Sequence, residues 1–215
     1  MEPTTNKEHL KDFQQKGEEA KKFLAEGFLP LLKKVLLQPL ELNQEFKQAG
    51  TQIPSAVLIL LSGILCTLLP YLSIGRTARQ FVPFQLFLRV GIAVMLTLIF
   101  IGLLSWGIKK LFQKTADFQK ELFTGALCSI PLLGALILIS IPSLLYSGIN
   151  FLGGFSHLFT SPLTSIIIIY AFFLMITICF QSLRSVFIKA NTAWYLSPAM
   201  VMVAIYLSYK IIEWV

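Results

Sequence analysis

The chain has 215 residues, of which 55% are hydrophobic and only 13% are charged, whereas an average soluble domain carries roughly 25% charged residues. The apolar residues are clustered, because no Lys, Arg, Asp or Glu lies between Glu121 and Arg184. No soluble core needs such a stretch, and a single bilayer span needs about 20 apolar residues. The composition therefore excludes a soluble domain and predicts an all-α, polytopic membrane protein.

The net charge of +7 raises the question of nucleic-acid binding, but the lysines lie next to the apolar runs. Each lysine near an anionic membrane surface contributes about 1 kcal/mol of binding free energy. We therefore expect the lipid bilayer and its anionic headgroups as partners, and no nucleic acid.

Residues 1–22 alternate acidic and basic side chains and contain no apolar run. This pattern predicts a solvated helix with a frayed start, and no cleavable signal peptide is expected because an apolar h-region is missing. Together with the segment that follows, these residues form an expected cytoplasmic N-terminal region, 1–50. The remainder, 51–215, is expected to form the transmembrane domain.

The segment 23–49 combines apolar residues at helical spacing with lysines between them. Pro30 and Pro39 each suit the first turn of a new helix. We interpret the segment as short amphipathic helices that lie in the membrane interface with the apolar side down. The alternative is packing against a soluble partner domain, which this chain does not contain. The expected lipid contacts are Phe23, Phe28, Leu32, Lys33, Lys34 and Phe46.

Five apolar runs are long enough to predict transmembrane helices. The run 81–87 between the first two of them is expected to follow the far membrane interface, and Trp106 is expected to anchor the exit of the second. The predicted spans are 53–74, 89–108, 123–146, 161–181 and 197–215.

The loop 109–120 carries four lysines and leads directly into the third span. Thr115 is expected to be the N-cap of a helix with Asp117 in its first turn, and this helix continues into the apolar run. The lysines of the loop are expected to contact lipid headgroups. These lipid contacts are Lys109, Lys110 and Lys114.

The distribution of Lys and Arg predicts the orientation of the chain. Fourteen of these residues fall on the side of the N-terminus and four on the other side. Because cytoplasmic loops carry the excess of positive charge, the N-terminus is expected in the cytoplasm and the C-terminus outside.

This layout resembles the Yip family of small membrane proteins, which have a cytoplasmic N-terminus, five spans and almost no tail. The resemblance lies in 31–46, LLKKVLLQPLELNQEF, and in 114–133, KTADFQKELFTGALCSIPLL. In the family, the second stretch looks like a basic loop, then Gly with an aromatic residue, then an apolar residue and Pro. Gly125 and Pro131 fit this pattern, whereas Ala126 stands where the aromatic residue is usual.

The resemblance implies little about activity. Eukaryotic members carry an Asp-Leu-Tyr-Gly-Pro stretch before the first span and are linked to Rab-type GTPases and membrane traffic. This chain lacks that stretch, so the GTPase link is not carried over. The difference favours a bacterial branch, which implies the bacterial cytoplasmic membrane as the location.

Residues suited to catalysis or metal binding are scarce. An intramembrane protease needs a nucleophile with a base, or paired acids, at bilayer depth, but the two histidines, His9 and His157, lie in a polar tract and at a loop edge. Cys66, Cys128 and Cys179 all fall in apolar runs and are expected to behave as small hydrophobes. We expect no enzyme, no cofactor and no metal site.

A coupled transporter usually holds an ionisable residue that faces the interior of the bundle. The sequence places no carboxylate inside any predicted span except Glu213. Lys210 and Glu213 could form an intramembrane polar pair, but we favour the alternative that both reach the outer interface, and Arg89 is expected to be an interface anchor. We therefore predict a non-enzymatic, Yip-like protein that organises lipid or protein partners at the cytoplasmic face. The protein partner is expected to be another membrane protein or a second copy of the chain. The alternative function is that of a small transporter or channel subunit.

Overall fold

The computed structural model describes residues 14, 17–19, 21–42, 52–73, 79–112, 116–146, 162–185 and 189–214. Within these ranges, five long helices are apolar enough to cross a membrane. The predicted all-α class with five transmembrane helices is confirmed, and it is consistent with an integral membrane protein. The five helices are α4 (Gln52–Ser73), α6 (Phe84–Phe112), α7 (Phe118–Tyr146), α9 (Pro162–Arg184) and α10 (Ala190–Trp214).

The segment before the bundle folds into short helices, as the amphipathic pattern predicts. A π-helical turn, η1 (Phe23–Gly27), runs into α2 (Phe28–Leu37), and a 3-10 turn, η2 (Pro39–Leu42), follows. The break between α2 and η2 falls at Gln38, whose backbone is non-helical because a residue before proline is disfavoured in the α region. Residues 43–50, and with them the predicted lipid contact Phe46, lie outside the described residues.

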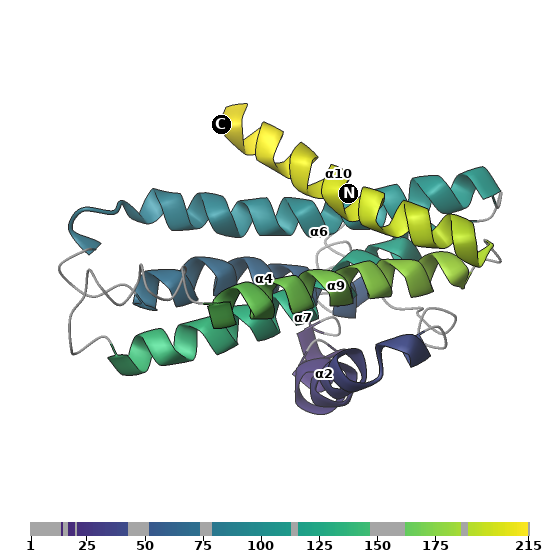
Figure 1. Cartoon of the computed structure of the whole chain (residues 1–215). Helices are drawn as coiled ribbons and strands as arrows, with labels where there is room; N and C mark the ends of the chain where they lie inside the picture. The colour runs from purple at the N-terminus through teal and green to yellow at the C-terminus, as the bar shows by residue number, and fades with distance from the viewer. Residues whose placement is uncertain are drawn as a thin grey trace, which may run out of the picture.

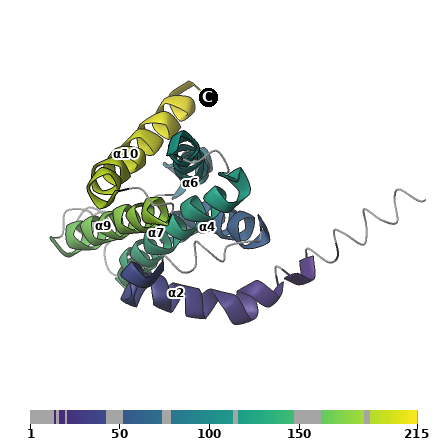
Figure 2. The same ribbon diagram turned by 90° about the vertical axis from the view of Figure 1, so that its right-hand side faces the viewer.

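Helix α7 is the centre of the bundle. It contacts α4, α6 and α9, and α10 packs outside them against α6 and α9. Figure 2 looks along the bundle and shows α10 and α2 on opposite sides of it. Helix α2 runs crosswise to the long helices and contacts α7, while η2 contacts α9.

Glycines bring three of the long helices close together. A Cβ added to Gly125 on α7 would collide with the backbone carbonyl oxygen of Leu98 on α6, and one added to Gly102 would lie 3.0 Å from the Cα atom of Leu122. Gly63 on α4 and Gly91 on α6 make a similar crossing. Such small-residue contacts let helix backbones approach within a membrane, and they set the register between α6 and α7.

Several helices extend beyond the predicted spans. Helix α6 begins at Phe84, inside the run expected along the interface, and α10 begins at Ala190, before the predicted span 197–215. The N-cap of α7 is Asp117 rather than Thr115, because the Gln119 amide donates a 3.0 Å hydrogen bond to the Asp117 carboxylate. Apolar runs mark only the hydrocarbon part of a helix, whereas the backbone hydrogen bonds continue into the polar region on either side.

We call the end of the bundle where α6 ends, α7 begins, α9 ends and α10 begins the basic end (Figure 1). Helix α2 lies in the half of the bundle nearer to this end (Figure 1). At the other end of the bundle, Arg79 donates hydrogen bonds of 3.1 and 2.8 Å to the carbonyl oxygens of Tyr71 and Leu72. This guanidinium therefore caps the last turn of α4.

Candidate functional site

A buried ion pair lies at the basic end, across the turn from α6 to α7. The ammonium of Lys109 is 2.6 Å from a carboxylate oxygen of Glu121, and the two side chains are only 3% and 9% exposed. Lys109 is in the last turn of α6 and Glu121 is in the first turn of α7. The close contact of the two helices at Gly102 and Gly125 brings these charges together inside the bundle.

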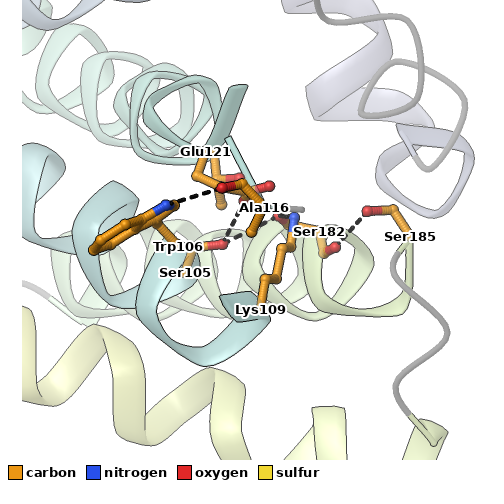
Figure 3. Close-up of polar contacts among 8 residues, drawn as sticks. Ser105, Trp106, Lys109, Ala116, Glu121, Ser182 and Ser185 are labelled. Atoms are coloured by element: carbon orange, nitrogen blue, oxygen red, sulfur yellow. Dashed lines mark hydrogen bonds and ion pairs between the residues drawn. The ribbon is translucent and has the colours of Figure 1, made fainter. Parts of the chain in front are cut away.

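Hydroxyl groups from all three neighbouring helices surround the pair (Figure 3). Ser105 on α6 donates to Glu121 over 2.8 Å, and Lys109 donates to Ser182 on α9 over 2.9 Å. The hydroxyls of Thr124 on α7 and Ser182 are 2.6 Å apart. We call these five residues the Lys109–Glu121 cluster, and it joins α6, α7 and α9 by polar contacts.

The polar atoms of this cluster satisfy one another. Opposite charges in contact neutralise each other, and the surrounding hydroxyls offset part of the cost of removing them from water. Among the described residues, a single buried side-chain nitrogen or oxygen atom lacks a hydrogen-bond partner. This atom is Ser55 Oγ on α4, which is not part of the cluster. Because each charge already has its partners, the primary role of the Lys109–Glu121 cluster is to hold the three helices together.

Trp106 on α6 contacts residues at the start of α7, next to the cluster. The indole nitrogen of Trp106 donates a 3.1 Å hydrogen bond to the carbonyl oxygen of Ala116 (Figure 3), and its ring meets Phe118 edge to face. The ammonium of Lys110 lies 4.6 Å from the centre of the Trp106 ring, within cation–π range. Trp106 therefore links α6 to the start of α7 in addition to lying near the end of a span.

The contact between α7 and α9 continues from the cluster to a pair of thiols. The sulfur atoms of Cys128 and Cys179 are 3.8 Å apart, and both residues are free cysteines without solvent exposure. Their burial fits the expected role as small hydrophobes. In the described part of the chain, no three His, Cys, Asp or Glu side chains gather as they would around a metal ion.

The burial of Lys109 overturns its prediction as a lipid contact. The expectation that no span holds a carboxylate except Glu213 is also wrong, because Glu121 lies inside the bundle. Lys110, by contrast, is exposed, and Lys114 lies outside the described residues. Sequence spacing offered a signal for the cluster: the small residues Gly102 and Ser105 share one face of α6 with Lys109, at intervals of three and four positions.

The stripe predicted to face lipid packs on the bundle instead. Phe23, Phe28 and Leu32 are half-buried against the main core cluster, and Val35 and Leu42 are fully buried in it. The spacing predicted the helix and its apolar face correctly, but not what that face covers. The transmembrane helices, and not the lipid predicted from the sequence, cover the apolar face of this segment.

A second apolar edge of this segment remains exposed. Leu29, Leu37 and Leu40 are 68%, 69% and 68% exposed. Of the two lysines predicted to contact headgroups, Lys33 is exposed and Lys34 is half-buried. We call these three leucines the outer edge of the α2–η2 segment.

The remaining predicted residues lie elsewhere. Lys210 and Glu213 form an ion pair of 2.6 Å near the end of α10, but both side chains are nearly half exposed. Arg89 is exposed on α6. Of the two positions that fit the family pattern, Gly125 makes the close contact with α6 and Pro131 is fully buried in α7.

Comparison of the chain with protein-family models, with curated proteins and with solved structures gives no match.

Proposed function

We propose that this chain is a non-enzymatic, Yip-like protein of the bacterial cytoplasmic membrane, with its N-terminus in the cytoplasm. Its proposed role is to organise lipid or protein partners at the cytoplasmic face. The observation that carries this proposal is the crosswise α2–η2 segment, which is fixed to the bundle by one apolar face and presents another outward.

The geometry of that segment suits a docking surface. Full burial of Val35 and Leu42 fixes the segment on the bundle, since burying such side chains contributes roughly 1.5–3 kcal/mol each. The three leucines of the outer edge remain about two-thirds exposed on the bundle. Because all three belong to one short segment, they provide apolar surface that acyl chains or an apolar partner can cover.

Exposed lysines accompany the apolar edge, next to a similar number of exposed glutamates. Lys33 is exposed on α2, and Lys21 and Lys22 are exposed immediately before η1. A helix that buries apolar side chains and keeps lysines at the headgroup level is the arrangement used by interfacial helices. We propose anionic lipid headgroups as the first partner of these lysines.

The lipid preference can be tested with the full-length protein in nanodiscs of mixed anionic and zwitterionic lipid. The triple variant Lys21→Gln, Lys22→Gln, Lys33→Gln should retain less anionic lipid on mild delipidation than the wild type, and added salt should reduce the difference. The control replaces exposed lysines outside this segment that are not among the predicted lipid contacts, Lys120→Gln with Lys189→Gln. Equal anionic lipid retention in the triple variant and the wild type would contradict the proposal.

A second candidate function, a small transporter or channel subunit, is favoured by the Lys109–Glu121 cluster. Ionisable side chains inside a membrane bundle often mark substrate or proton pathways. The hydrogen bonds of the cluster favour a structural role over a substrate or proton pathway, because Lys109 and Glu121 each already bind partners within the bundle.

Flux measurements distinguish the two functions. Under the proposed function, proteoliposomes carrying the wild type and the Glu121→Gln variant pass ions, protons and small solutes at the rate of empty liposomes. Wild-type flux that disappears in Glu121→Gln but persists in Glu213→Gln would establish the transporter instead.

A further inference from the structure

Helix α10 is both the least apolar and the least buried of the five candidate spans. Its most apolar stretch has a mean hydropathy of 1.4, against 2.1 to 2.5 for the other four, yet only 28% of it is buried, the smallest share of the five. A helix with a large lipid-facing surface should be the most apolar one. The least apolar span of the described chain is instead the one that the bundle covers least.

Three exposed tyrosines of α10 lie along a single stripe. Tyr195, Met202, Tyr206 and Tyr209 are between 61% and 76% exposed. Ala199 and Glu213 continue the stripe and are also exposed. The steps alternate between three and four residues, which is the 3.5-residue spacing of helices that wrap around each other. The buried residues of α10 lie on the opposite face, and they are Ala193, Ser197, Met200, Val201, Ala204 and Ser208.

Tyr206 is the member of the stripe that suits lipid least. It lies four residues from the middle of α10, about 6 Å along the helix axis, in a hydrocarbon core about 30 Å thick. A phenol in that position points its hydroxyl into a region without water, where an unpaired polar group is unfavourable. Aromatic residues with a polar tip are normally placed at the two membrane interfaces instead.

The stripe is chemically complementary to itself. A tyrosine hydroxyl both donates and accepts hydrogen bonds, so Tyr206 can bond to the same residue of a second copy across a two-fold axis. The outer end of the stripe carries opposite charges, Lys210 and Glu213, so two parallel copies meet without net repulsion. Ala199, exposed on the same face, has a side chain small enough for two backbones to approach.

We propose that the stripe formed by Tyr195, Ala199, Met202, Tyr206, Tyr209 and Glu213 is the interface of a homodimer, in which α10 of one copy packs in parallel against α10 of a second copy. Two copies in the same membrane have the same orientation, so a two-fold axis along the membrane normal relates them. The interface lies on the side of the bundle opposite α2 (Figure 2). It therefore leaves the outer edge of the α2–η2 segment free and does not depend on the proposed function.

Cysteine cross-linking in reconstituted vesicles tests the dimer. The three native cysteines are buried, so the wild type reports the background. Ala199→Cys and Tyr206→Cys should give disulfide-linked dimers on mild oxidation. The control is Ile169→Cys, on the lipid side of α9 and 67% exposed, which should stay at the background level. Dimers absent at both stripe positions, or equally abundant at Ile169→Cys, would overturn the proposal.

A second measurement tests the tyrosine hydroxyl without altering the packing. Subunit counting in vesicles over a range of protein-to-lipid ratios gives the dimer dissociation constant of each variant. Tyr206→Phe should weaken the dimer about threefold, the usual effect of one hydrogen bond between membrane helices. Tyr170→Phe, at an exposed tyrosine of α9, should leave the constant unchanged. A wild type that is monomeric over the whole range, or an equal shift for the two variants, would contradict the proposed interface.

Discussion

The backbone carbonyl oxygen of Leu98 on α6 fills the space beside Gly125 on α7 that a Cβ atom would occupy. This contact fixes how closely the two helices approach, and Gly125 lies one helical turn from Glu121. Because the carbonyl belongs to a helix backbone, it cannot move aside as a flexible side chain could. The buried pair therefore depends on a glycine that carries no charge itself.

Gly125→Ala should destabilise the protein by about 1–3 kcal/mol, the usual cost of forcing extra atoms into a packed core. Gly107→Ala on α6 is the matched control, since no atom lies within 4 Å of its added Cβ. That variant should be neutral or gain up to about 1 kcal/mol from helix propensity. Unfolding of both variants in mixed micelles measures the difference, and equal stabilities would show that the close contact is unimportant.

Removing one member of the buried pair should be far more harmful than removing both. Lys109→Met leaves the Glu121 carboxylate buried without its partner, which typically costs about 3–5 kcal/mol. The double variant Lys109→Met, Glu121→Met removes both charges and should recover most of this loss. The same micelle unfolding assay measures the coupling, and losses that simply add would contradict the paired arrangement.

The exposed pair on α10 provides the contrast. Lys210 and Glu213 are as close as the buried pair, at 2.6 Å, but are 46% and 48% exposed. Exposed ion pairs contribute little to stability because water and salt screen them. In micelles dilute enough to keep the protein monomeric, Glu213→Gln should therefore change the unfolding free energy by less than about 1 kcal/mol. A loss similar to that of Lys109→Met would show that this pair is covered in the membrane.

The Arg79 guanidinium should protect the last turn of α4. It donates two hydrogen bonds to carbonyl oxygens there and lies 5.0 Å from the centre of the Tyr71 ring. Arg79→Lys keeps the charge but loses the two-pronged geometry. Amide hydrogen exchange should accelerate near Ser73 in this variant and remain unchanged in Arg89→Lys. Unchanged exchange in Arg79→Lys would rule out the capping role.

The predicted orientation can be tested with two exposed positions at opposite ends of the bundle. Phe81 is 81% exposed and Leu111 is 85% exposed, and the native cysteines are buried. In intact cells, an impermeant thiol reagent should label Phe81→Cys from outside but reach Leu111→Cys only after permeabilisation. The reverse pattern would show that the count of lysines and arginines places the chain the wrong way round.

The number and type of the long helices could be predicted because each apolar run is about as long as a bilayer span. Their ends could not, since a helix continues for one or two turns into the polar region without an apolar signal. Phe84 at the start of α6 and Ala190 at the start of α10 show this. Asp117 was placed in the right turn of α7, but its role as the N-cap emerges only from the geometry.

The candidate site was missed for a different reason. Lysines next to apolar runs usually lie at the membrane surface, and Lys109 follows that pattern in sequence. Its burial depends on Glu121 and Ser182, which come from two other helices, and sequence order does not reveal that they meet. Similarly, the apolar face of α2 was predictable, but the competition between lipid and the bundle for Phe28 depends on the tertiary arrangement.

The most direct test of the proposed function is to identify what the outer edge of the α2–η2 segment touches in native membranes. A photo-reactive amino acid at Leu37, which is 69% exposed, should capture anionic lipid or one defined protein. The same group at Ile169 on α9, which is 67% exposed, should capture bulk lipid in the proportions of the membrane. Enrichment of anionic lipid or of a single protein at Leu37 over Ile169 is the predicted result. Identical adducts at the two positions would contradict the claim that this segment organises partners at the membrane face.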